Sequence, residues 1–80
     1  MYVYVLYSDI TLKYYVDQTA DLDSRLQRHN SGFVKSTKAG IPWRLVLKIE
    51  VENRSEALLL EKKIKKRGAK RYLFDNHFGV

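Results

Sequence analysis

The sequence contains no cysteine, so neither a disulfide framework nor a thiolate metal site can hold the chain together. It has no apolar run of membrane-spanning length, and its start lacks the charged and apolar regions of a signal peptide. We therefore expect a cytoplasmic protein with no membrane partner, whose fold depends on packing. The 80 residues, 45% of them hydrophobic, are enough for one small domain, which we expect to span residues 1–80.

Acidic residues are scarce towards the end of the chain, where Asp75 is the only one beyond Glu61. The whole chain has 15 Lys and Arg against 9 Asp and Glu, a formal net charge of +6, and seven of the basic residues fall between Lys62 and Arg71. Clustered positive charge favours a polyanionic partner, with nucleic acid ahead of a membrane surface. A solvated helix face is the alternative, and charge alone does not decide between them.

Two segments at the start of the chain alternate with the period of a β-strand. They are "MYVYVLY" at 1–7 and "LKYYVDQ" at 12–18, with "SDIT" between them as a hairpin loop. This loop predicts that paired residue numbers sum to 19, so that Val3 lies opposite Val16 on an apolar face. On the other face Tyr4 lies opposite Tyr15, with both hydroxyls free for polar work. A third strand is predicted at 43–52, with its alternating apolar residues on one face, namely Trp43, Leu45, Leu47, Ile49 and Val51.

Helices are predicted between and after these strands. The first begins at an N-cap of Thr19 or Asp21 and ends at Gly32. A loop follows over residues 33–42, and it contains Lys35 and Lys38. The second helix has an N-cap of Asn53 or Ser55 and ends near Arg67, and a last short helix is predicted over residues 69–78. The predicted fold is therefore a single α/β domain of the α+β type, a three-stranded antiparallel sheet flanked by helices.

Several polar side chains lie where this pattern expects apolar ones or share a face of the sheet. Glu61 falls inside the apolar stripe of its helix, between Leu58 and Ile64, and His29 lies on the stripe of the first helix with Arg25 at its edge. A carboxylate removed from water costs several kcal/mol unless a charged or hydrogen-bonding group meets it. A Glu61–Arg25 salt bridge, a hydrogen-bonded core histidine and a packed tyrosine pair are the structural explanations.

Taken together, these side chains suit chemistry on a phosphodiester. They are one carboxylate, one imidazole, one guanidinium and two phenols. A carboxylate binds Mg²⁺, which keeps most of its waters and needs few protein ligands. An arginine stabilises the charge that develops on phosphorus, and a phenol or an imidazole moves protons.

Five blocks of the sequence, in order and at matching spacing, resemble the GIY-YIG endonuclease domain. They are "YVY" at 2–4, "KYYVDQT" at 13–19, "LDSRLQRHNSG" at 22–32, "STKAGIPWRLV" at 36–46 and "RSEALLLEKKIKK" at 54–66. The resemblance is to the small stand-alone bacterial members, which are related to the N-terminal nuclease domain of the excision-repair endonuclease. It covers residues 2 to about 67.

This resemblance implies a role for each polar residue at a matching position. Tyr4 matches the general base towards the attacking water, and Tyr15 matches the tyrosine that hydrogen-bonds near the scissile phosphate. Arg25 matches the phosphate-stabilising arginine, and His29 matches the helix residue that orients or deprotonates the base. Glu61 matches the glutamate that is the only protein ligand of one divalent metal, so Mg²⁺ or Mn²⁺ is the implied cofactor.

The chain also departs from the family at two positions and is hard to align with it after Gly68. Asp17 replaces the glycine that ends the second motif, and Tyr2 replaces the glycine of the first motif, which is a common variation in the small members. Asn76 is the nearest counterpart of the family's late asparagine. Because 80 residues leave no room for the DNA-targeting domain of the larger members, we expect a partner protein to supply targeting.

The sequence therefore predicts a metal-dependent endonuclease that hydrolyses DNA phosphodiesters, in repair or recombination. DNA contacts are predicted on two basic segments, with the residues Lys35, Lys38, Lys62, Lys65, Lys66 and Arg67. The main alternative is a nucleic-acid-binding module of the same fold with weak or no activity, which Asp17 and the missing targeting domain favour. The second alternative is a structural Glu61–Arg25 core pair in a basic domain that binds RNA.

Overall fold

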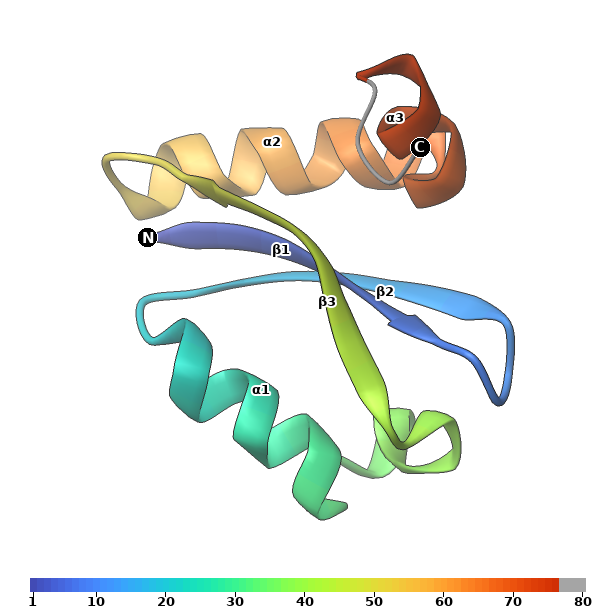
Figure 1. Cartoon of the computed structure of the whole chain (residues 1–80). Coiled ribbons are helices and arrows are strands. Elements are labelled where there is room, and N and C mark those ends of the chain that lie inside the picture. Colours follow the sequence, from blue (N-terminus) through green and yellow to red (C-terminus); the bar gives the residue numbers. More distant parts are fainter. Residues whose placement is uncertain (77–80) are drawn as a thin grey trace.

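The computed structural model describes residues 1–76 as a three-stranded antiparallel sheet flanked by helices (Figure 1). The strand order is β2–β1–β3, so β1 is central and the other two strands form the edges. The predicted α+β class is confirmed. Along the chain the elements are β1 (Tyr2–Ser8), β2 (Lys13–Thr19), α1 (Leu22–Ser31), the 3-10 helix η1 (Lys35–Gly40), β3 (Trp43–Glu50), α2 (Arg54–Arg67) and α3 (Ala69–Asp75). Within residues 1–76 no helix is long and apolar enough to cross a membrane.

Helices cover both faces of the sheet, with α2 and α3 on one side and α1 on the other (Figure 1). The α2 face holds a buried cluster of small and branched residues: Val3, Val5, Val16, Leu47, Ala57, Ile64 and Leu73. The α1 face holds a second cluster of larger side chains: Tyr4, Leu6, Leu22 and Trp43. The expectation that this second face leaves the Tyr4 hydroxyl free is therefore wrong, because α1 packs on it and Tyr4 is fully buried.

The predicted register of the β1–β2 hairpin is wrong by two residues. Tyr4 lies opposite Asp17 and not opposite Tyr15, which pairs with Leu6. The hairpin loop starts one residue later than predicted, since the Leu12 amide donates to the Ser8 carbonyl over 2.8 Å. A slip of two residues keeps every side chain on its face, because successive side chains alternate. The face assignments of the paired residues therefore survive, but the predicted pairs do not, and Val3 lies opposite Gln18 and not opposite Val16.

The prediction that the five alternating apolar residues from Trp43 to Val51 share one face is also wrong. The register between β1 and β3 shifts at Val5, which lies opposite Leu47, while Leu6 lies opposite Leu45. One extra residue in β3 reverses the alternation of side chains at that point. Trp43 consequently packs in the cluster on the α1 face, whereas Leu47 packs on the α2 face.

The predicted boundaries of α1 and α2 are confirmed, and the structure decides between the two candidate capping residues of each helix. Asp21 caps α1 by accepting from the Ser24 amide over 3.1 Å, and Gly32 ends that helix with φ 86°. Asn53 caps α2 by accepting from the Glu56 amide over 2.9 Å. The last helix covers the first seven residues of the predicted range 69–78. Residues 77 and 78 of that range lie outside the described residues.

The segment predicted as a loop over residues 33–42 contains η1, which Trp43 holds against the sheet. The indole nitrogen of Trp43 donates to the Thr37 carbonyl over 2.6 Å. The ring lies so close to Gly40 that a Cβ there would be 2.3 Å from Cζ2 of the indole. Gly40 is therefore required by the close approach of the ring.

We expect Gly40→Ala to lower the free energy of unfolding by about 1–3 kcal/mol, because the added methyl overpacks the Trp43 ring. Without that clash the same change would stabilise the protein by about 0.4–1 kcal/mol, since alanine restricts the unfolded chain. Urea unfolding of Gly40→Ala measures the sign, with Ser36→Ala in the same 3-10 helix as the control. An increase in stability would contradict the packing of Trp43 described here.

Candidate active site

Tyr4 and His29 meet in the interior between β1 and α1. The Tyr4 hydroxyl oxygen lies 3.0 Å from Nε2 of His29, and neither residue has more than 1% of its surface exposed. Burial raises the pKa of Tyr4, and the nearby Asp17 carboxylate raises it further, while Arg25 beside the hydroxyl lowers it. Burial and the Arg25 charge lower the pKa of His29. At neutral pH the pair is therefore an uncharged phenol beside an uncharged imidazole.

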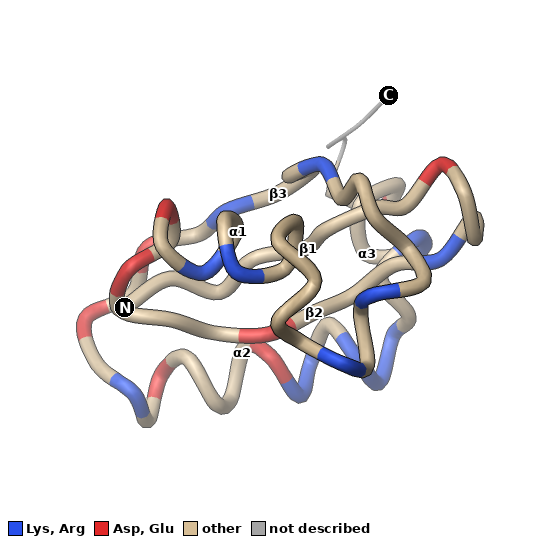
Figure 2. Tube along the Cα trace, turned by 90° about the horizontal axis from the view of Figure 1, so that it is seen from below, with Lys and Arg blue, Asp and Glu red and all other residues tan. Residues whose placement is uncertain are grey.

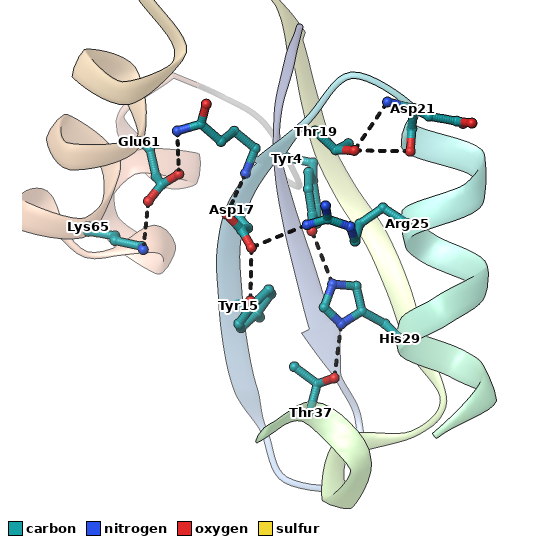
Figure 3. A network of polar contacts seen from close by, with 11 residues as sticks. Tyr4, Tyr15, Asp17, Thr19, Asp21, Arg25, His29, Thr37, Glu61 and Lys65 are labelled. Carbon is teal, nitrogen blue, oxygen red and sulfur yellow. Dashed lines mark hydrogen bonds and ion pairs between the residues drawn. The ribbon is translucent and has the colours of Figure 1, made fainter. Parts of the chain in front are cut away.

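Tyr15, Asp17 and Arg25 form a polar group next to this pair (Figure 3). The Tyr15 hydroxyl donates to Oδ2 of Asp17 over 3.0 Å, and Nη1 of Arg25 lies 3.6 Å from the same oxygen. Burial, the hydrogen bond to Asp17 and its negative charge together raise the pKa of Tyr15 to about 12. The Tyr15 ring also contacts His29, with their centroids 4.9 Å apart. Asp17 thus pairs with both groups that the sequence predicted to contact a phosphate.

Glu61 reaches this region from α2, on the other side of the edge strand β2. Its carboxylate accepts from Nε2 of Gln18 over 3.1 Å and from Nζ of Lys65 over 2.8 Å. The predicted alternative of a Glu61–Arg25 salt bridge is wrong, because Arg25 pairs with Asp17. The Glu61 charge is near enough to contribute to the raised pKa of Tyr15.

Figure 3 shows how far the structure brings the five predicted catalytic residues together. Tyr4, Tyr15, Arg25 and His29 converge between the sheet and α1, and Glu61 lies across β2 from them. The consecutive residues Asp17 and Gln18 link the two parts, since the backbone N–H of Gln18 donates to Oδ1 of Asp17 over 2.8 Å while its side chain binds Glu61.

Two polar residues of this network were not predicted from the sequence. Thr37 on η1 is buried, and its Oγ1 lies 2.9 Å from Nδ1 of His29. Gln18 binds Glu61 from β2. The sequence carried no signal for Thr37, because the segment around it has no periodicity that separates buried from exposed positions. The alternation of β2 does assign Gln18 to the α2 face, but not to a particular partner.

The residues predicted to bind nucleic acid form two groups that lie on different sides of the sheet. Lys62, Lys65, Lys66 and Arg67 are exposed on the carboxyl-terminal half of α2, which is mostly blue in Figure 2. Lys35 and Lys38 are exposed on η1, which lies on the α1 side in Figure 1. Two of the cations already have acidic partners, since Lys65 binds Glu61 and Nε of Arg67 lies 2.6 Å from Asp75.

An open cleft of about 570 Å³ lies between β2 and the junction of α2 with α3. Its walls combine aromatic and basic side chains, with Tyr14 and Tyr15 from the strand and Lys65, Arg67, Lys70 and Arg71 from the helices. We call this the basic cleft. Tyr15 and Lys65 belong to its wall and also to the polar network, so the basic cleft adjoins the candidate active site.

The oxygen atoms of the Glu61 and Gln18 side chains suit a hard divalent cation. Residues 1–76 contain no group of three or more His, Cys, Asp or Glu side chains that could enclose a metal. Mg²⁺ does not need such an enclosure, because it retains waters and binds through one or two carboxylates. Oε1 of Gln18, whose Nε2 binds Glu61, is buried without a hydrogen-bond partner among the described residues. An oxygen of this kind beside a carboxylate fits the ion.

The fold agrees with what comparison with known proteins finds. The family model of the GIY-YIG catalytic domain matches residues 1–73. The chain belongs to the GIY-YIG family, whose members are nucleases. No curated protein matches the chain.

One solved structure supports the same assignment. It is the solution NMR structure of the UPF0213 protein BH0048 from Bacillus halodurans, which is 31% identical in sequence with a TM-score of 0.60. The match covers 98% of this chain and 85% of the other.

Proposed function

We propose that the protein is a metal-dependent DNA endonuclease that hydrolyses phosphodiester bonds. The observation that carries the proposal is the convergence of Tyr4, Tyr15, Arg25 and His29 from three elements, with Glu61 beside the same edge strand. Membership of a nuclease family supports it. Cleavage of DNA in repair or recombination, in the cytoplasm and with a partner protein for targeting, is part of the proposal.

Tyr4 and His29 would accept the proton of the attacking water in two linked transfers. As the water oxygen bonds to phosphorus and the bond from phosphorus to the leaving oxygen breaks, one water proton would pass to the Tyr4 oxygen and the Tyr4 proton to Nε2 of His29. The leaving oxygen would take a proton from solvent. This order avoids a free phenolate, which the raised pKa of Tyr4 makes rare near neutral pH. It also uses the lowered pKa of His29, which keeps an unprotonated nitrogen available to receive the proton.

Arg25 and Tyr15 would bind the phosphate that is cleaved. Both already bind a carboxylate, Asp17, and a phosphodiester offers the same kind of singly charged oxygen acceptor, whose negative charge increases as the water attacks. Tyr4 has no exposed surface, so water reaches its hydroxyl only after a neighbouring side chain moves. Arg25, with 32% of its side chain exposed, is the neighbour that a phosphate would draw outward.

Glu61 would hold the divalent cation, with the side-chain oxygen Oε1 of Gln18 as the second protein ligand. When bound, Mg²⁺ or Mn²⁺ neutralises charge on the phosphate and the leaving oxygen. Lys65 would pair with the Glu61 carboxylate until the cation displaces it, and its ammonium would then be available to a phosphate.

The alternative of a weakly active or inactive nucleic-acid-binding module has one observation in its favour. Asp17 occupies Arg25 and Tyr15, the two residues that in the proposed nuclease bind the phosphate. The intact set of catalytic side chains favours the nuclease. Nicking by the unmodified protein separates the two functions, since a binding module would retain DNA without cutting it.

We expect supercoiled plasmid to be nicked in Mg²⁺ or Mn²⁺ but not in EDTA, and Glu61→Gln to abolish nicking. The variant should fold normally, because the ion pair that it loses is partly exposed and such pairs contribute about 0–1 kcal/mol. Glu50→Gln, an exposed glutamate at the end of β3, is the control. Residual nicking by Glu61→Gln together with a large drop in melting temperature would show that Glu61 is structural.

DNA binding should depend on the basic cleft and weaken with salt. For duplex DNA each neutralised phosphate adds about −0.9 to the slope of log K against log salt concentration. The double variant Lys70→Ala and Arg71→Ala should therefore flatten the slope by up to about 1.8 units. The matched control is Lys48→Ala with Arg54→Ala, which removes two exposed charges outside the cleft. Equal slopes for the two double variants would place the DNA elsewhere.

Asp17 should compete with the phosphate for Arg25, so removing its charge should raise activity. We expect Asp17→Asn and Asp17→Gly to increase the nicking rate and DNA affinity up to about fivefold, the equivalent of about 1 kcal/mol for a partly exposed ion pair. The metal requirement should not change. Asp17→Asn separates the effect of charge from the backbone freedom that glycine adds. Loss of activity in both variants would make Asp17 a required part of the site.

A further inference from the structure

Thr37 lies at the end of the buried polar chain that begins at Tyr4 (Figure 3). Only 1% of its surface is exposed, and its hydroxyl oxygen lies 2.9 Å from Nδ1 of His29 and 3.3 Å from the Val34 carbonyl oxygen. Two further hydrogen bonds fix its backbone. The Thr37 amide donates to the Val34 carbonyl over 3.1 Å, and the Trp43 indole donates to the Thr37 carbonyl over 2.6 Å. The hydroxyl is therefore held in place beside the His29 ring.

The hydrogen-bond count along this chain selects one tautomer of His29. A carbonyl only accepts, so the contact with Val34 makes the Thr37 hydroxyl a donor there and leaves its oxygen free to accept from Nδ1–H. Nε2 then has a lone pair and accepts from the Tyr4 hydroxyl, for three hydrogen bonds in series. In the Nε2–H tautomer Nδ1 is an acceptor, so the Thr37 hydroxyl must donate to Nδ1 and loses its hydrogen bond to the Val34 carbonyl. Buried polar groups favour the arrangement that satisfies more of them.

We propose that Thr37 is the positioning residue that fixes His29 as the Nδ1–H tautomer, so that Nε2 faces Tyr4 as a proton acceptor. This inference rests on the proposed function, because its consequence for the rate requires Tyr4 and His29 to move protons. Thr37 does not touch the substrate. It acts through His29, in the way that the partner of the second ring nitrogen sets the tautomer in other histidine sites.

The experiment compares Thr37→Val, which keeps the shape of the side chain without the hydroxyl, with Thr37→Ser, which keeps the hydroxyl. In the unmodified protein and in Thr37→Ser, ¹⁵N NMR of the His29 ring should show a protonated Nδ1 and an unprotonated Nε2. In Thr37→Val the ring should change towards the Nε2–H tautomer. Plasmid nicking by Thr37→Val should fall about ten- to hundredfold in kcat with KM unchanged, a part of what a general base contributes. Thr37→Ser should retain most of kcat.

Three results would overturn the inference. They are an Nε2–H tautomer in the unmodified protein, an unchanged tautomer in Thr37→Val, and a rate for Thr37→Ser as low as that for Thr37→Val. The first needs no variant, so it decides the matter even where Thr37→Val fails to fold. If the unmodified protein nicks no DNA with either cation, the proposed function fails. The NMR comparison still decides whether Thr37 sets the tautomer.

Discussion

The contact between Tyr4 on the central strand and His29 on α1 is the interaction on which the site depends. It buries two polar side chains in a cluster that otherwise consists of Leu6, Leu22 and Trp43. A buried polar group without a partner costs about 1–3 kcal/mol, so each of the two requires the other to be in place. The orientation of α1 on the sheet is thereby tied to the position of a hydroxyl. The same helix also carries Arg25, which is placed along with His29.

Much of the fold follows from local patterns in the sequence. The ends of both long helices were predictable, and each N-cap was narrowed to two candidates that include Asp21 and Asn53, since these features are set by chemistry within a few residues. The face of each side chain in the hairpin was predictable from alternation alone. The pairing within the hairpin and the irregularity in β3 were not, because hydrogen bonds between residues distant in sequence decide them.

For the candidate site too, the sequence identified the residues but not the contacts between them. Glu61 and His29 were detected because each lies on an apolar stripe, Arg25 because it lies at the edge of one, and the two tyrosines because they share a face of the sheet. The family resemblance then gave each of the five a role. What the sequence did not reveal was which polar groups pair with each other. Arg25 lies with Asp17 and not with Glu61, a difference of partner that depends on how α1 and α2 are distributed over the two faces of the sheet. A sequence pattern assigns a residue to a face but does not choose among the polar groups that it meets there.

The edge strand β2 has a consequence for the precision of the site. The partners of Arg25 and Glu61 on this strand, Asp17 and Gln18, are consecutive residues whose side chains point to opposite faces. Arg25 and Glu61 therefore come from helices on different layers of the molecule, yet both bind side chains of two residues that a single planar peptide unit joins. Covalent geometry at that unit is far stiffer than the packing of either helix. When the packing of either helix changes slightly, the helices and the flexible side chains thus move, while the peptide unit between Asp17 and Gln18 keeps its geometry.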